Sequence, residues 1–204
     1  RVWVGGQYKD VATETNGAFW LATSDGLVRY APFPWRTPGE VEEVDAVVHA
    51  ALEDGEGRLW FASTASLNLN RNDQWQRIKW PDGFEPDFQP TDSLYALPPG
   101  SFAIGVGDKP LLFDPATGQF AYLIHRSGGR VRILGQFKDG RLCVLIRTDN
   151  AASPGEYRLE QFDGRQFAPF NGAQPERDVI GELNFIHAAR NGDLWFGGNA
   201  GLAV

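Results

Sequence analysis

Residues 79–92, KWPDGFEPDFQPTD, place aromatic rings among carboxylates, and this combination suits a sugar-binding site. The rings are those of Trp80, Phe84 and Phe88, and the acids are Asp82, Glu85, Asp87 and Asp92. Sugar C–H groups stack on aromatic faces, and sugar hydroxyls donate hydrogen bonds to carboxylates. A long, Pro-rich stretch without regular structure is itself a mild indication of function. The competing interpretation is structural, with the rings attaching a long loop to the edge of a sheet.

The overall composition limits the partners that this site could serve. The 204 residues carry a formal net charge of −7, so a Lys/Arg-rich face for nucleic acid or an anionic membrane is not expected. No apolar run approaches the ~20 residues of a membrane-spanning helix, and no secretory signal is visible. The sequence contains no Met, which suggests a piece of a longer or processed chain. Its single cysteine, Cys143, excludes an internal disulfide.

A repeat anchored on glycine organises the chain that must position the candidate residues. The anchors are Gly17, Gly57, Gly100, Gly140 and Gly192, at spacings of 40, 43, 40 and 52 residues. A turn former or an acid precedes each anchor, and an apolar strand follows it. Three residues after the anchor stand Trp20, Trp60, Ala103, Cys143 and Trp195. In each of the five units, therefore, a turn is followed by a strand.

Short strands account for the rest of each unit, and the pattern predicts an all-β fold. Four strands in 40–52 residues, repeated, are typical of a β-propeller made of four-stranded antiparallel blades. The repeats fall around 8–35, 44–78, 93–123, 131–170 and 183–204, and residues 1–6 are either a partial blade or a closing strand. We expect the Trp20, Trp60 and Trp195 column to fill the gaps between blades. Cys143 takes the same position, so we expect a buried and unreactive thiol.

The fold adds candidate ligand contacts, because the loops from second to third strand and from blade to blade share one face of a propeller. Asp25 and Asn199 lie in loops of the first kind. His125 and Arg126 lie in a loop of the second kind and could bind an anion, although a solvated pair explains them equally.

Catalytic and metal sites find little support in the residue pattern. Asp/Glu pairs could act as general acid and base in a glycosidase, but no spacing sets two carboxylates across one centre. A lactonase-like metal site on the innermost strands would have Glu53 and Asn184 among mostly apolar neighbours. His49 and His187 occupy equivalent strand positions, where packing or channel lining is the favoured explanation. We therefore predict no catalytic residues, no metal and no cofactor.

Three phrases resemble the two-component regulator propeller repeat family. They are DGEGRLWFAS at 54–63, NGDLWFGGNAGL at 191–202 and NGAFWLATSDGLVRY at 16–30. The third and fourth units depart from the pattern at Ala103 and Cys143. The resemblance implies a fragment of a seven-bladed ring from the periplasmic or extracellular part of a sensor kinase, including hybrid sensors of carbohydrate breakdown products.

The predicted function is therefore a non-enzymatic ligand-sensing or protein-interaction propeller, with carbohydrate as the suggested ligand. Expected partners are neighbouring domains of a longer chain and a homodimer formed through the parent protein, with no nucleic acid. Two alternatives remain open. One is a carbohydrate-active or lactonase/lyase-like enzyme, and the other is a scaffold with no small ligand.

Overall fold

The computed structural model describes residues 8–13, 19–24, 26–30, 47–71, 74–98, 100–147, 157–172 and 175–204. The chain divides into two compact units, Arg1–Glu43 and Val44–Val204. The first unit contains an antiparallel sheet of β1 (Tyr8–Thr13), β2 (Phe19–Thr23) and β3 (Gly26–Tyr30). Residues 1–6, predicted as a partial blade or a closing strand, lie outside the described residues.

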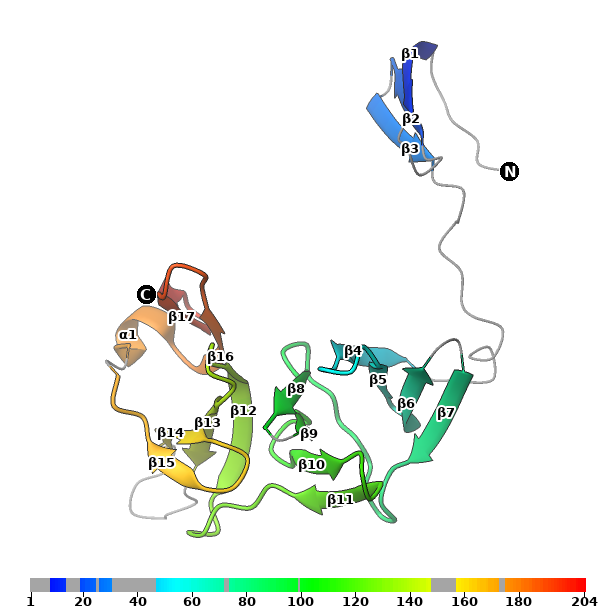
Figure 1. Cartoon of the computed structure of the whole chain (residues 1–204). Helices are drawn as coiled ribbons and strands as arrows, with labels where there is room; N and C mark the ends of the chain where they lie inside the picture. Colours follow the sequence, from blue (N-terminus) through cyan, green and yellow to red (C-terminus); the bar gives the residue numbers. More distant parts are fainter. Residues whose placement is uncertain are drawn as a thin grey trace. The chain divides into compact units, whose positions relative to one another are not determined.

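The second unit contains four antiparallel sheets, each built from strands that follow one another in the chain (Figure 1). The first sheet comprises β4 (Val48–Glu53), β5 (Leu59–Ser63), β6 (Ser66–Arg71) and β7 (Gln74–Lys79). The second comprises β8 (Leu94–Leu97), β9 (Ser101–Ile104), β10 (Leu111–Asp114) and β11 (Gln119–Tyr122). The third comprises β12 (Arg130–Gln136), β13 (Leu142–Arg147), β14 (Tyr157–Phe162) and β15 (Phe167–Pro169). The fourth comprises β16 (Leu183–Ala188), β17 (Leu194–Gly198) and β18 (Leu202–Ala203), and the one-turn helix α1 (Arg177–Ile180) precedes it.

Hydrophobic clusters between consecutive sheets hold this unit together. Trp60 and Leu67 of the first sheet pack with Phe102 and Phe113 of the second. A second cluster joins the β8–β11 sheet to the β12–β15 sheet, and a third joins that sheet to β16–β18. A small twisted sheet cannot bury both of its faces alone, so stacking on the next sheet completes its core. The predicted all-β propeller built of antiparallel blades is confirmed.

The Trp position of the repeat shows this packing most clearly. Trp60 is 1% exposed, and its ring centroid lies 4.8 Å from that of Phe102 in the next blade. Cys143, which replaces Trp in its unit, is fully buried and belongs to the cluster shared with β16–β18. The predicted burial of Cys143 is confirmed, and burial raises the pKa of its thiol to about 12, which disfavours the reactive thiolate.

Trp195 does not follow the expectation that the repeated Trp side chains fill gaps between blades. Its side chain is 38% exposed, because within Val44–Val204 no described sheet follows β16–β18 to cover it. The prediction of a buried wedge at Trp195 is therefore wrong in this structure, and the Trp20 side chain lies outside the described part.

The turn before the second strand of a sheet requires a backbone conformation at the anchor position that glycine adopts most readily. Gly57 has φ 74° and Gly140 has φ 86°, a left-handed conformation that favours glycine. Each closes a tight turn between the first two strands of its sheet, and this turn fixes which residues of those strands face one another.

Candidate functional site

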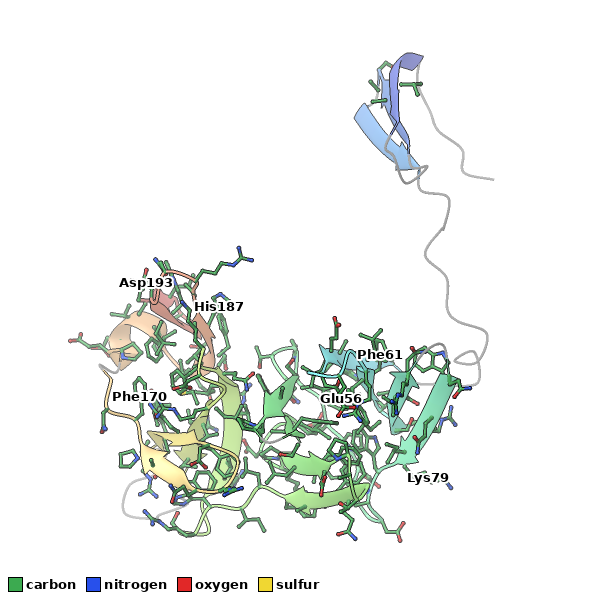
Figure 2. All side chains as sticks on the ribbon, viewed as in Figure 1. Glu56, Phe61, Lys79, Phe170, His187 and Asp193 are labelled. Atoms are coloured by element: carbon green, nitrogen blue, oxygen red, sulfur yellow. The ribbon has the colours of Figure 1, made fainter. Side chains whose placement is uncertain are left out.

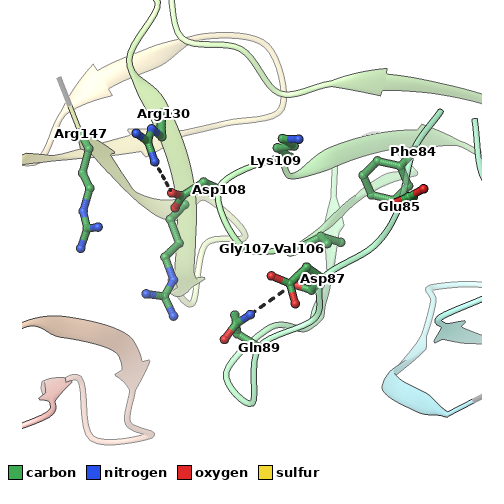
Figure 3. Close-up of a pocket in the computed structure, with 11 residues that line it drawn as sticks. Phe84, Glu85, Asp87, Gln89, Val106, Gly107, Asp108, Lys109, Arg130 and Arg147 are labelled. Carbon is green, nitrogen blue, oxygen red and sulfur yellow. Dashed lines mark hydrogen bonds and ion pairs between the residues drawn. The ribbon is translucent and has the colours of Figure 1, made fainter. Parts of the chain in front are cut away.

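A cavity of about 710 Å³ lies among loops of the second and third sheets of the Val44–Val204 unit (Figure 3). Its walls come from the stretch between β7 and β8, the β9–β10 loop, the start of β12 and the end of β13. These are blade-to-blade and second-to-third-strand loops with their adjoining strand ends. The volume falls in the usual range for small-molecule sites.

Basic side chains form one wall. Arg130 and Arg147 stand directly opposite each other in the β12–β13 pairing, and Arg132 follows two residues along β12. Arg130 Nη1 lies 3.5 Å from Asp108 Oδ2, a pair visible in Figure 3, and Arg147 forms an ion pair with Glu182. Arg132 Nη2 donates a hydrogen bond of 3.1 Å to Thr91 Oγ1. Lys109, in the β9–β10 loop, adds a fourth basic group.

Acidic and amide groups line the other side. Glu85, Asp87 and Gln89 extend from the stretch between β7 and β8, and the Glu85 and Asp87 side chains are exposed. Figure 3 shows Gln89 bonded to Asp87, where the Gln89 Nε2 atom donates to the Asp87 carbonyl at 3.5 Å. The cavity thus faces a ligand with guanidinium donors on one side and carboxylate acceptors on the other.

Asp92 holds the two loops in place. Its side chain is 6% exposed, and Oδ2 accepts hydrogen bonds from the backbone amides of Gln89 at 2.8 Å and Gly107 at 2.7 Å. A carboxylate occupied by two amides in this way acts as a link between loops. Asp92 itself does not line the cavity, and it links two segments that do.

The predicted aromatic contacts pack largely on one another. Trp80 donates from Nε1 to the Ser63 carbonyl at 3.1 Å, and its ring contacts Phe84, Phe88 and Phe120. Phe88 also stacks on His49, with centroids 4.7 Å apart. Phe84 is 7% exposed and lines the cavity, while Trp80 and Phe88 do not. These rings attach the long stretch between β7 and β8 to the neighbouring sheets.

His125 and Arg126 have different surroundings. His125 is 1% exposed, and its Nδ1 lies 3.1 Å from the Ser127 backbone amide nitrogen. Its Nε2 lies 3.3 Å from Glu160 Oε2, and the ring meets Phe167 edge-on. Arg126 is exposed. The histidine is therefore part of the interior beside β14, separated from solvent.

The remaining candidates lie elsewhere. Asn199 Oδ1 accepts from the Glu182 backbone amide at 2.9 Å, next to the carboxylate that pairs with Arg147. Asp25 lies outside the described residues.

A second cavity of about 450 Å³ lies between the innermost strands. Tyr95 of β8, Gln136 of β12 and His187 of β16 contribute to its lining. Burial and the charge of Asp92 raise the pKa of Tyr95 to about 12, against the opposing charge of Arg132. The phenol therefore stays protonated at neutral pH.

Several carboxylates that line neither of these two cavities are engaged in turns. Asp54 accepts from the Glu56 and Arg58 amides, and Asp114, Asp139 and Asp163 cap their own turns in the same manner. Among the described residues, no group of three or more His, Cys, Asp or Glu side chains could hold a metal ion. Nor does the described part of the chain contain a helix that is long and apolar enough to cross a membrane.

Sequence reasoning missed the basic wall. The available signal was the R-V-R pattern at 130–132 directly after a blade-to-blade loop. Arg147 is 15 residues further along the chain, so only the pairing of β12 with β13 reveals that it joins the others.

Fold and cavity together define a β-propeller with a charged, ligand-sized cavity among its loops. No family model matches the sequence, and no curated protein matches it. The chain is similar to virginiamycin B lyase from Staphylococcus aureus, with a TM-score of 0.51 and 14% identity over 95% of this chain and 64% of the lyase.

Two extracellular domains also give similar structures. The extracellular domain of a putative one-component system from B. thetaiotaomicron has a TM-score of 0.49 and 17% identity, over 98% of this chain and 27% of that one. The extracellular domain of a putative hybrid two-component system from B. thetaiotaomicron has a TM-score of 0.46 and 16% identity, over 96% and 27%. The chain thus spans less than two thirds of the lyase and about a quarter of each of these two proteins. At these identities the likeness is one of fold.

Proposed function

We propose that this chain is a non-enzymatic ligand-sensing propeller that binds a small hydroxylated molecule, such as a sugar, in the 710 Å³ cavity. The observation that carries the proposal is the charged lining supplied by two different blades and the stretch before them. Guanidinium groups of β12 and β13 oppose the carboxylates of Glu85 and Asp87. Such an arrangement satisfies hydroxyl groups as donors and as acceptors.

The resemblance of the repeat to two-component regulator propellers supports a place in signalling. On that basis we assign the chain to the extracytoplasmic part of a sensor protein. Neighbouring domains of a longer chain are then its natural partners, with a homodimer formed through the parent protein.

Binding is testable by thermal unfolding of the chain in the presence of a panel of neutral and acidic mono- and oligosaccharides. A ligand present at about 100 times its Kd adds roughly 2.7 kcal/mol to the free energy of unfolding and raises Tm by roughly 5–10 °C. We expect at least one sugar to produce this shift. If no small molecule of the panel shifts Tm, the chain is a scaffold and the sensing proposal is wrong.

The double variant Glu85→Gln/Asp87→Asn tests the cavity itself. Loss of both carboxylate acceptors is expected to weaken sugar binding at least tenfold, since hydrogen bonds to charged groups contribute about 1.5–3 kcal/mol each. Asp82→Asn is the matched control, because Asp82 is an exposed acid of the same stretch and does not line the cavity. Equal weakening by the control would place the site elsewhere.

The second candidate function is that of an enzyme. Two observations favour it: His187 lines the 450 Å³ cavity, and the chain shares its fold with a lyase. Its test is turnover of glycan and lactone substrates, with product formation followed over hours. Turnover abolished by His187→Ala would replace the sensing proposal with an enzymatic one. Binding of a sugar with no product formed would exclude the enzyme.

A further inference from the structure

The four basic side chains of the 710 Å³ cavity differ in how their charge is compensated. Arg130 pairs with Asp108, and Arg147 pairs with Glu182. Lys109 is exposed, so water solvates its charge. Among the described residues, Arg132 makes no ion pair, and its one hydrogen bond goes to the uncharged hydroxyl of Thr91.

The surroundings of Arg132 leave part of its guanidinium without a partner among the described residues. Arg132 is half-buried, on the face of β12 opposite to that of the core residues Val131 and Ile133. Arg132 Nε is buried without a hydrogen-bond partner. The nearby Asp92 is occupied by the Gln89 and Gly107 amides. Asp92 contributes a nearby negative charge, but no carboxylate is hydrogen-bonded to Arg132 among the described residues, so part of the donor capacity of its guanidinium is unused.

The cavity offers space for an anionic group that could bind to the Arg132 guanidinium. Arg132 lines this cavity. Arg130, two residues earlier on β12, and Arg147, opposite Arg130 on β13, line it as well, and both form ion pairs. Arginine binds carboxylates through hydrogen bonds about twice as strong as those between neutral groups. Glu85 and Asp87 line the same cavity and remain available to accept hydrogen bonds from hydroxyl groups of the ligand.

We propose that Arg132 is the anchor for an anionic group, a carboxylate, on the ligand of this cavity. The ligand class is then a small hydroxylated acid, such as a sugar acid, and a neutral sugar binds more weakly. This inference rests on the proposed function, since it names the charge of the ligand that the same cavity binds.

The test compares galacturonate with galactose, which differ in the carboxylate at C6, by thermal shift and isothermal titration of the full chain. We expect galacturonate to bind at least tenfold more tightly. In Arg132→Met this preference disappears, and in Arg132→Lys it is reduced but kept. Arg165→Gln is the control, because Arg165 is an exposed arginine outside the cavity.

The unliganded variants provide a second readout that a merely structural role would not produce. Arg132→Met removes a partly buried guanidinium that forms no ion pair with a described residue, so its Tm without ligand is expected to equal or exceed that of the wild type. A fall of Tm by several degrees would show that Arg132 holds the fold and would overturn the proposal.

Other outcomes separate this inference from the proposed function. If galactose binds as tightly as galacturonate, Arg132 is not an anion anchor and the sensing proposal stands. Galactose 6-sulfate serves as a third probe, and tighter binding of the sulfate than of galacturonate would overturn the assignment to a carboxylate. If no probe of the wider sugar panel binds, both proposals fail.

Discussion

Individual side chains of the repeat act mainly as connectors within turns. Asp54 shows this best, because Oδ2 accepts from Trp60 Nε1 at 2.8 Å and from Arg58 Nε at 2.7 Å. The acid at the start of the repeat motif therefore fixes the tryptophan that fills the gap between blades. Figure 2 labels Glu56, which lies in this turn, and Phe61, which lies on the strand β5 that follows it.

Asp54 gives a prediction for acid stability. Burial raises the pKa of Asp54, but hydrogen bonds from Trp60, Arg58 and the backbone outweigh it and hold the pKa below the ordinary 3.8. A group with a lowered folded-state pKa stabilises the protein above its unfolded pKa, and this contribution is lost as pH falls through the folded pKa. We expect Asp54→Asn to lower the free energy of unfolding at pH 7 by about 1–3 kcal/mol.

The same variant should lose less stability than the wild type between about pH 4 and pH 2. Urea unfolding at several pH values measures both effects. Asp82→Asn is the control, and an identical pH profile for Asp54→Asn and the wild type would contradict the assigned role.

At the scale of the secondary-structure elements, neighbouring blades pack closely where their innermost strands meet, as β12 and β16 do. Innermost strands β4, β12 and β16 each contain a bulge, and in β12 it falls between Ile133 and Gly135. A Cβ atom built on Gly135 would lie 2.5 Å from the Ile186 carbonyl oxygen on β16. Glycine at this position is thus a requirement of packing between two blades.

Gly135→Ala is accordingly expected to destabilise the fold by about 1–3 kcal/mol, the usual cost of overpacking. Gly55→Ala is the matched control, since no atom lies within 4 Å of a Cβ there and its φ is not positive. Chemical denaturation of both variants measures the difference. Equal stability of Gly135→Ala and the wild type would mean that β12 and β16 lie further apart in solution.

At the scale of the whole molecule, stability is a chain of neighbour contacts. In the Val44–Val204 unit, each core cluster joins two consecutive sheets. Repeat proteins of this kind open locally, because each unit contacts only its neighbours. The 710 Å³ cavity lies beside the second of these junctions, so its geometry depends on the packing of β8–β11 against β12–β15.

Amide hydrogen exchange can test whether the blades of the Val44–Val204 unit open locally. Trp60→Ala is expected to cost about 3–5 kcal/mol and to reduce amide protection in β4–β11 more than in β16–β18. Phe196→Ala, in the third cluster, should have the opposite distribution. A uniform loss of protection in both variants would show that the unit unfolds as one block.

Much of the architecture was predictable from the sequence, because the signals for it are local. A glycine with positive φ, such as Gly57, must close a turn, and the apolar residues after it must form a strand wherever they lie in the chain. Repetition of that local rule predicted the blades, the burial of Trp60 and the burial of Cys143. The exposure of Trp195 escaped it, since burial there depends on the presence of a neighbouring sheet.

The composition of the cavity could not be predicted in this way. The sequence marked the stretch 79–92 by its own residues, but the rings of Trp80 and Phe88 serve packing, and Asp92 serves loop attachment. Arg130, Arg132 and Arg147 face that stretch only because strand register and blade stacking bring them there. The sequence by itself determined the blades, since turns and strands follow from near neighbours. The tertiary structure decided the charge of the cavity, because that charge is a sum over residues far apart in the chain.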